Sequence, residues 1–455
     1  MISNSSHLHL FGDFTTPDLK VVLDGSTLTD RRSALDGNFT LSASSKYYVS
    51  NGGLPTGDSQ SSDALSFALD DSVVEFDGGT YNTVNLDVNS TTSSSVNLIG
   101  SYMGVGYPGQ HVYRGQTQLN LSAGAQIRDG RFTALDDVVG RVVDSTLPSL
   151  TLKDRADFRV NNSTVIESNV DDNWHDGFLR GSGESQVAFD NVLFKNGSDC
   201  NGPLFSNADS SQLKLRNSDV AASWSCSPAI AISASDRSKV LVESTRIAIE
   251  NMLLNVAVSG TTLFSAEGAA QIEVRGGEYD SDLIPADSWR QFMAIASARG
   301  DSRIVLDGGS YSQHAFGIEL STHLAHAVDD ATIELVAGSF DLSINQDAMS
   351  DGLLHLNAED RGTIIVYGSD FNYPLGEVPD LAGTLEGKLI DGNLIRWKFA
   401  RATDARIILV PEPSGPVIAG LAIPLLVRTL RRSKKEMSID SPRNQRRTCV
   451  ELTAT

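Results

Sequence analysis

A ten-residue phrase that recurs four times near the C-terminal end constrains the fold more than any other feature of this chain. The copies AQIEVRGGEY, SRIVLDGGSY, ATIELVAGSF and GTIIVYGSDF begin at Ala270, Ser302, Ala331 and Gly362, at nearly constant steps. The third and fifth residues of each copy are apolar, as in a β-strand with one buried face, and small residues follow where the chain can bend. A strand and a turn that recur about every 30 residues predict a β-repeat architecture.

Weaker copies extend the repeat toward the N-terminus. A second strand also precedes several copies at a fixed distance, as Leu263-Phe264-Ser265 does before Ala270. Two strands in constant phase indicate a coil that buries its apolar face only when coils stack on one another. The weaker copies start at Ser238, Ser211, Ser185, Ala156, Thr117, Ser94, Ser72 and Leu19, and the other preceding strands are Leu204-Phe205-Ser206 and Ala231-Ile232-Ser233.

The sequence therefore predicts an all-β fold, a single-stranded parallel β-helix (β-solenoid) of roughly 10–12 coils with a C-terminal antiparallel cap. The body resembles the right-handed parallel β-helix proteins. The alternative is a β-sandwich whose strands are spaced by coincidence. The expected parts are an irregular start (1–71), the parallel β-helix (72–372), a β-cap (381–410), a sorting tail (411–435) and a disordered basic extension (436–455).

Three shorter predictions concern local structure. Gly100–Gln116 is rich in Gly and Tyr and is expected to be an irregular loop. The step from Thr117 to Ala156 is longer than the steps that follow it, which predicts a protruding loop or a short helix within Arg128–Leu150. In the cap, strands are expected at Thr384–Ile390, Leu394–Ala400 and Ala405–Val410, with a hairpin turn at Asp391-Gly392.

The chain is strongly acidic, with 36 Lys and Arg against 57 Asp and Glu, a formal charge of −21. An acidic body lacks the basic footprint that nucleic-acid binding needs, so nucleic acid is excluded as a partner. Such a charge fits a soluble surface, divalent cations or an extracellular matrix. The abundant Ser, Asn, Asp and Gly suit the many turns of a solenoid.

Two of the three cysteines share one phase of the repeat. Cys200 and Cys226 follow their respective phrase starts, Ser185 and Ser211, at the same offset along the chain. Strands of adjacent coils lie about 4.8 Å apart, within the Cα separation that a disulfide tolerates. Cys200 and Cys226 are therefore predicted to be stacked neighbours, either joined by a disulfide in an oxidising compartment or reduced and buried.

The C-terminal tail carries an ordered set of signals. Pro411-Glu412-Pro413 is followed by the apolar run Pro416–Val427 and then by a basic cluster from Arg428 to Lys435. This order resembles the PEP-CTERM sorting signal of exported bacterial proteins, from Pro411 to the C-terminus. The resemblance implies Sec export, transient tethering in the inner membrane through residues 416–435, and removal of the tail by an exosortase-type processing enzyme. Such proteins reach the cell surface or the exopolysaccharide matrix.

The length and charge of the tail agree in part with a transient membrane tether. The apolar run is shorter than the roughly 20 residues of a helical membrane span, while the basic cluster obeys the positive-inside rule for an exported body. The chain departs from the family pattern at both ends. Residues Glu436–Thr455 follow the basic cluster, and the first residues carry no export signal. We expect the true N-terminus to lie upstream of Met1, with a gene remnant as the alternative.

The densest group of chemically active residues is Asp171-Asp172-Asn173-Trp174-His175-Asp176, which is expected in a loop between strands. Asp171, Asp172 and Asp176 are candidate ligands for Ca²⁺, which prefers oxygen donors. Clustered carboxylates also serve glycoside cleavage, but neighbouring Asp residues in an extended loop point apart and are ordinary turn material. No catalytic residue and no other cofactor is predicted.

Three further groups of residues have patterns that bear on chemistry or packing. Asp280–Trp289 is a second acidic loop with an aromatic residue. His323 and His326, with Asp329 and Asp330, have the HxxH spacing of one helical turn, but no pattern supplies a third metal ligand, so a solvated loop is expected. An aromatic ladder in the core is predicted from one shared register, that of Tyr279, Tyr311, Phe340 and Phe371.

The function expected from the sequence is that of a non-catalytic, exported solenoid at the cell surface or in extracellular polysaccharide. The alternatives are a polysaccharide lyase or hydrolase on the same scaffold and an adhesin-like carbohydrate-binding module. An activity screen on polysaccharides separates the enzyme from the other two, and glycan binding separates the adhesin from the structural protein.

Overall fold

The computed structural model describes residues 2–3, 7–12, 20–32, 38–50, 65–81, 86–104, 110–128, 130–167, 177–195, 202–224, 229–251, 260–283, 291–315, 320–344 and 353–412. Residues Met1–Val410 form one unit and Pro411–Thr455 a second, of which only Pro411 and Glu412 are described. The description below concerns the first unit.

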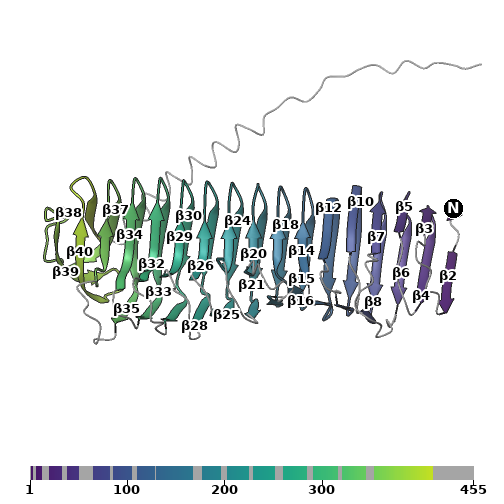
Figure 1. The fold of residues 1–455 in the computed structure, drawn as a ribbon, viewed down its shortest axis with the longest axis horizontal. Helices are drawn as coiled ribbons and strands as arrows, with labels where there is room; N and C mark the ends of the chain where they lie inside the picture. Colours follow the sequence, from purple (N-terminus) through teal and green to yellow (C-terminus); the bar gives the residue numbers. More distant parts are fainter. Residues whose placement is uncertain are drawn as a thin grey trace, which may run out of the picture. The chain divides into compact units, whose positions relative to one another are not determined.

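Nearly all described strands belong to three lines of parallel pairing, which we call sheets 1, 2 and 3 in the order in which each coil visits them. Figure 1 shows the coils stacked in chain order. Sheet 1 contains β1 (Ile2–Ser3), β3 (Lys20–Asp24), β5 (Asn38–Ser42), β7 (Leu65–Leu69), the starts of β10 (Leu86–Ile99) and β12 (Gln110–Ser122), β14 (Arg131–Ala134), β17 (Leu150–Leu152), β20 (Leu179–Gly181), β23 (Phe205–Asn207), β26 (Ala229–Ala234), β29 (Gly260–Ala266), β32 (Gln291–Arg299), β34 (Leu320–Val328), β36 (Leu356–Ala358) and β40 (Leu394–Arg401).

Sheet 2 contains the strands of the phrase, and sheet 3 follows the turn that ends each phrase. Sheet 2 is formed by β2 (His7–Gly12), β4 (Thr27–Arg32), β6 (Lys46–Ser50), β8 (Val73–Asp77), the ends of β10 and β12, β15 (Val139–Val143), β18 (Asp157–Asn161), β21 (Gln186–Asp190), β24 (Gln212–Arg216), β27 (Lys239–Glu243), β30 (Gln271–Arg275), the starts of β33 (Arg303–Ala315) and β35 (Thr332–Ile344), and β37 (Thr363–Ser369). Sheet 3 is formed by β9 (Thr80–Tyr81), β11 (Tyr102–Gly104), β13 (Gln126–Arg128), β16 (Thr146–Pro148), β19 (Thr164–Ile166), β22 (Leu193–Lys195), β25 (Asp219–Trp224), β28 (Arg246–Asn251), β31 (Glu278–Leu283) and the ends of β33 and β35.

The predicted parallel β-helix is confirmed. Ile272 pairs with Ile304, Ile304 with Ile333 and Ile333 with Ile364, and all four side chains are at most 1% exposed. The apolar pairs predicted ahead of the phrase lie on the sheet 1 strands β23, β26 and β29 or directly before them. Sheet 2 has fifteen described strands, counted from the ranges above, rather than the 10–12 coils expected.

The expected loop or helix within Arg128–Leu150 is wrong, because an additional coil occupies this stretch. Its strands β14, β15 and β16 lie in sheets 1, 2 and 3 and pair with the coils on either side. The long step is therefore two short steps, one from Thr117 to Val138 and one from Val138 to Ala156. The sequence pattern did not reveal this coil, because Gly140 stands where the other copies have an apolar residue. Its missing side chain leaves room for the ring of Phe158, because an added Cβ would lie 2.2 Å from that ring.

Two other local predictions are corrected. The copy at Leu19 places β3 in sheet 1 and not in sheet 2, since β3 pairs with β5 and β4 continues sheet 2 toward β6. Gly100–Gln116 is not an irregular loop in its described part, where β11 and the first half of β12 pair in parallel. Residues 105–109 lie outside the described residues.

The C-terminal cap is antiparallel, as expected. β39 (Ala382–Leu389) and β40 form a hairpin around Asp391-Gly392, where Gly392 has a φ of 84°. β38 (Gly376–Glu377) pairs antiparallel with β41 (Arg406–Pro411), and β37 pairs antiparallel with β39. β40 also continues sheet 1 by pairing in parallel with β36, so one strand joins the cap to the solenoid.

The aromatic ladder is confirmed for three of its four members. Tyr279 stacks on Tyr311 with ring centroids 4.9 Å apart, and Tyr311 stacks on Phe340 at 4.8 Å. Phe371 does not continue the ladder. It follows the end of β37, and Trp397 of the cap instead packs edge-on against Phe340 at 5.7 Å.

Candidate functional site

The three turns of each coil have different chemistry, and the predicted site residues fall mainly on one of them. We call the turns corner A (between sheets 1 and 2), corner B (between sheets 2 and 3) and corner C (between sheet 3 and the next strand of sheet 1). The segments 168–176, 196–201, 225–228, 252–259, 284–290, 316–319 and 345–352, which lie outside the described residues, all connect a sheet 3 strand to the next sheet 1 strand. Most loops to which the sequence assigned chemistry therefore occupy the same corner.

The candidate Ca²⁺ ligands Asp171, Asp172 and Asp176 belong to the connection between β19 and β20, outside the described residues. Cys200 and Cys226 lie in the next two connections of corner C, also outside them, so their pairing stays a prediction. Of the acidic loop Asp280–Trp289, residues 280–283 form the end of β31 and the rest is not described.

The histidine pair is not in a solvated loop, because His323 and His326 both lie on β34 of sheet 1. Within the strand, the N–H groups of Leu324 and Ala325 both donate to the carbonyl of His355, at 2.8 and 3.0 Å. This irregularity changes the alternation of side chains, so the two imidazoles project on one side with centroids 5.2 Å apart.

The surroundings of the pair favour a neutral His323. Burial, and then the neighbouring His326, lower the pKa of His323 to about 4. Its Nδ1 lies 2.9 Å from the carbonyl oxygen of Leu354 and so donates a hydrogen bond to it, while His326 Nε2 lies 3.3 Å from Glu359 Oε1. Asp329 and Asp330 pair with arginines of neighbouring coils instead of approaching the imidazoles. In the part of the chain that the structure describes, no three His, Cys, Asp or Glu side chains are grouped to hold a metal ion.

Corner A carries a column of acidic residues in the left-handed conformation. Positive φ values of 59–60° at Asp136, Asp154, Asp209 and Asp236 are tolerated because Asp, like Asn and Gly, adopts this region readily. Gly takes the same place in other coils. The column comprises Asp136, Asp154, Gly183, Asp209, Asp236, Gly268, Gly300, Asp329 and Asp360.

A shallow groove opens along corner A where two glycines follow each other. It has a volume of about 510 Å³ and is lined by Asp209, Asp236, Arg237, Gly268, Ala269, Gly300 and Asp301. Three carboxylates, one guanidinium and the corner backbone therefore face one depression. Such a set of acceptors and donors suits a polar ligand more than an apolar one.

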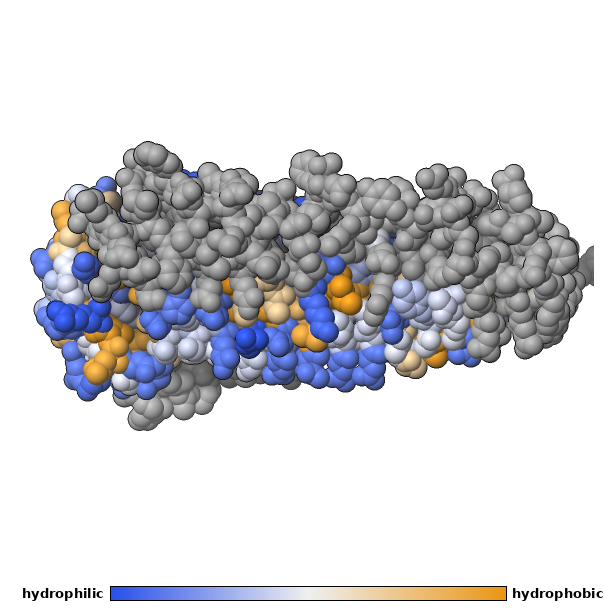
Figure 2. Space-filling model, turned by 60° about the horizontal axis from the view of Figure 1, so that its bottom comes forward, coloured by the Kyte–Doolittle hydropathy of each residue, from blue (hydrophilic) through white to orange (hydrophobic). Residues whose placement is uncertain are grey.

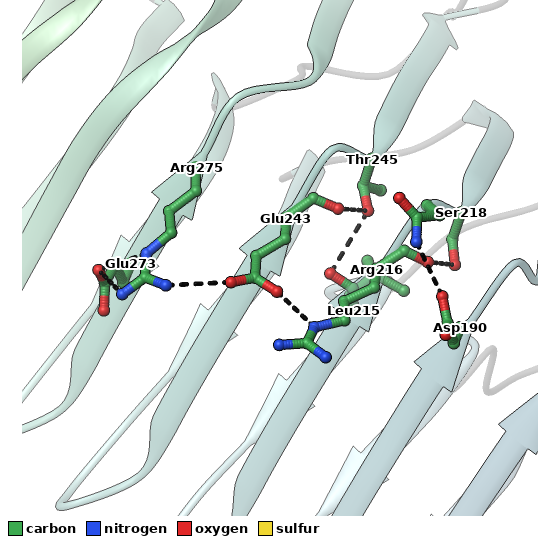
Figure 3. Close-up of polar contacts among 9 residues, drawn as sticks. Asp190, Leu215, Arg216, Ser218, Glu243, Thr245, Glu273 and Arg275 are labelled. Carbon is green, nitrogen blue, oxygen red and sulfur yellow. Dashed lines mark hydrogen bonds and ion pairs between the residues drawn. The ribbon is translucent and has the colours of Figure 1, made fainter.

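The outer side of sheet 2 carries a row of alternating charges near corner B. Figure 3 shows Arg216, Glu243 and Arg275 on the neighbouring strands β24, β27 and β30, with Glu243 between the two guanidinium groups. Arg275 Nη1 lies 3.1 Å from Glu243 Oε1, and Arg275 Nε donates to Glu273 Oε1 at 2.8 Å. These ion pairs join consecutive coils along the row.

Comparisons with known proteins return nothing. No protein-family model matches the sequence, no curated protein matches it, and no solved structure matches the fold. Among the described residues there is also no helix with the length and apolar character to cross a membrane.

Sequence reasoning missed the groove, although a signal was present. An Asp or Gly stands two residues before every phrase start from Thr117 onward, as Asp236 does before Ser238 and Gly268 before Ala270. Aligning these positions would have shown both the acidic column and its interruption at two consecutive glycines.

Proposed function

We propose that this chain is a non-catalytic structural solenoid that is exported and held at the cell surface or in extracellular polysaccharide. The structural part of this proposal is supported by the continuous pairing of sheet 2 from β2 to β37. Each coil buries its apolar side chains only through its neighbours, so a repeat protein of this kind acts through its length and its outer surface.

The outer surface supports the same role. Ion pairs link consecutive coils at several places, for example Arg155 to Asp137 at 2.5 Å and Arg303 to Glu334 at 2.6 Å. The arginines of these pairs are 49–66% exposed, so solvent screens them and each pair contributes little to stability on its own. The coloured surface in Figure 2 is mainly hydrophilic, which suits a protein surrounded by water and glycans.

Export is supported by the resemblance of the tail to the PEP-CTERM sorting signal. Pro411 is the last residue of β41, Glu412 follows it, and both are exposed, which supports access of a processing enzyme to the start of the motif. Pro413 and the apolar and basic segments through Lys435 lie outside the described residues. The partners that follow from this proposal are an exosortase-type enzyme, the inner membrane during transit, and extracellular polysaccharide.

Expression in a bacterium that has an exosortase tests the export proposal. The chain is fused to a cleavable Sec leader, and the surface fraction is analysed by intact mass. We expect loss of the tail near Pro413 in the parent protein and retention of the full tail when Pro411, Glu412 and Pro413 are all replaced by Ala. Asp404→Asn, an exposed change in the cap, is the matched control and should be processed normally. An uncleaved tail on the parent protein would contradict the proposal.

The non-catalytic assignment is tested separately on purified protein. A screen with acidic and neutral polysaccharides should release no reducing ends and no unsaturated products. The triple variant in which Asp171, Asp172 and Asp176 become Ala should behave as the parent does. Turnover that disappears in this variant would establish the polysaccharide-cleaving alternative in place of the structural one.

A further inference from the structure

Four steps along corner A share one hydrogen bond that links a coil to the next. The N–H of the left-handed residue donates to the carboxylate of the Asp that occupies the same place one coil later. Gly183 N donates to Asp209 Oδ2 at 2.8 Å, and Asp209 N donates to Asp236 Oδ2 at 3.2 Å. The same contact joins Gly115 to Asp136 at 3.0 Å and Asp136 to Asp154 at 3.3 Å.

Among the described residues, the contact is also absent between Asp154 and Gly183, between Gly300 and Asp329 and between Asp329 and Asp360, but in the groove two consecutive coils lack the carboxylate itself. The coil after Asp236 has Gly268 at this place, and the coil after Gly268 has Gly300, so neither supplies a carboxylate. Within the described residues, the N–H groups of Asp236 and Gly268 accordingly have no hydrogen-bond acceptor. Two donors on consecutive coils therefore face the groove that Asp236, Gly268 and Gly300 line.

An earlier coil shows that a hydroxyl group can replace the Asp carboxylate as the acceptor for the corner N–H. At corner A between β7 and β8, the N–H of Asp71 donates to the hydroxyl oxygen of Thr92, which stands on the next coil. The same hydroxyl donates its proton to Asp70 Oδ1 at 2.9 Å. A hydroxyl group thus satisfies the corner N–H and a neighbouring carboxylate at once.

The groove repeats this arrangement without its own hydroxyl. Asp236 and Asp301 line the groove and offer carboxylates, as Asp70 does beside Asp71 in the earlier coil. Arg237 adds a cationic donor at the same place. A ligand that carries several hydroxyl groups, each able to accept from an N–H and donate to a carboxylate, matches this set.

We propose that the groove over Asp236, Gly268 and Gly300 binds a neutral carbohydrate chain, whose hydroxyl groups replace the missing Asp carboxylates of the column. The charge of the site selects neutral over acidic glycans, because the lining has three carboxylates and one guanidinium and repels an anion. This inference rests on the proposed display at the cell surface, and it names neutral glycans as the ligand class of the displayed solenoid. The proposal needs only the purified protein, so it can fail while the export proposal stands, and the reverse.

Binding is measured by isothermal titration calorimetry with cellohexaose, maltoheptaose and xylohexaose, and with polygalacturonate as the acidic comparison. We expect at least one neutral oligosaccharide to bind the parent protein, with or without EDTA. Gly268→Asp supplies the missing carboxylate to Asp236 N–H and narrows the groove, so it should weaken binding about tenfold or more. Asp301→Asn and Arg237→Met change side chains that line the groove, keep the backbone unchanged and should each weaken binding severalfold.

The matched control is Gly276→Asp, on corner B of the same coil. Gly276 has a φ of 64°, and an added Cβ there meets nothing within 4 Å, so this variant places the same new carboxylate outside the groove and should bind as the parent does. The thermal unfolding midpoint of each variant is recorded, and Asp301→Asn decides the result if Gly268→Asp fails to fold. The proposal is overturned if no neutral oligosaccharide binds at millimolar concentration, if only polygalacturonate binds, if EDTA abolishes binding, or if Asp301→Asn and Arg237→Met bind as tightly as the parent.

Discussion

Replacing Gly140 with Ala should destabilise the solenoid, because the new methyl group would overlap the ring of Phe158 on the next coil. An ideal Cβ at Gly140 lies 2.2 Å from Cε1, 2.3 Å from Cδ1 and 2.6 Å from Cζ of that ring. Ordinary contacts begin at 3.4 Å, so the ring must move by about 1.2 Å (3.4 − 2.2) in a core where Phe158 is 0% exposed. Overpacking of this kind costs about 1–3 kcal/mol, and the lower chain entropy of Ala returns about 0.5–1 kcal/mol. The expected net loss is about 1–2 kcal/mol.

The assay is urea unfolding of four proteins that form a double-mutant cycle. The parent, Gly140→Ala, Phe158→Val and the double variant are followed by far-UV circular dichroism. Val lacks the three ring atoms that the new methyl group would meet, so Gly140→Ala should be neutral or slightly stabilising in the Phe158→Val background. The coupling energy should then exceed about 1 kcal/mol. Equal losses in the two backgrounds would refute the packing explanation for Gly140, and with it the assignment of this stretch as a coil.

Three further predictions concern the core and the charged row. Glu243→Gln should lower the free energy of unfolding by about 0.5–1 kcal/mol at low salt and by less at high salt, because its two arginine partners are half exposed. Burial lowers the pKa of His111 to about 4 from an unfolded value near 6.5. As the pH falls from 6.5 to about 4, the unfolded chain takes up a proton at His111 and the folded chain does not, so the free energy of unfolding decreases by about 3 kcal/mol in total. His111→Leu lacks this proton uptake, so its unfolding midpoint should decrease less than that of the parent between pH 7 and pH 4. A difference between the two midpoints that stays constant with pH would contradict this. Tyr311→Leu should cost about 2–4 kcal/mol in urea unfolding, because it removes a ring stacked on both sides, whereas Tyr311→Phe keeps the stack and loses only the hydrogen bond to Gly308 O, about 1 kcal/mol.

The sequence was sufficient to predict the sheet 2 strands and the fold class, because their apolar positions repeat in register with a turn. Ile272, Ile304, Ile333 and Ile364 recur at nearly constant steps, and a solenoid is the arrangement that lines them up. The strand that precedes the phrase was also visible, since Leu263-Phe264 and its equivalents keep a fixed distance. Sheet 3 was visible only through its aromatic residue, because its many very short strands carry too little pattern.

The failures of prediction have local physical causes. The coil at Val139–Val143 was not detected because Gly140 stands where the other copies have an apolar side chain. The ring of Phe158, from the next coil, fills the space that this side chain would occupy. Leu19 was assigned to the wrong sheet because alternating apolar residues look alike in sheets 1 and 2. The groove was overlooked because it depends on two carboxylates that the column lacks, and such a gap appears only once the residues before the phrase starts are aligned with one another.

Corner C accommodates nearly all of the variation in coil length. The coil that runs from Val138 to Ala156 is much shorter than the one that runs from Ala156 to Ser185, and the described strands of both still pair residue for residue with their neighbours. Length added or removed at this edge therefore does not change the hydrogen-bond register of the interior. A foreign peptide grafted between β19 and β20, and another between β22 and β23, would be attached to neighbouring strands about 4.8 Å apart. The hydrogen bonds between coils would therefore set the spacing between the two grafted peptides.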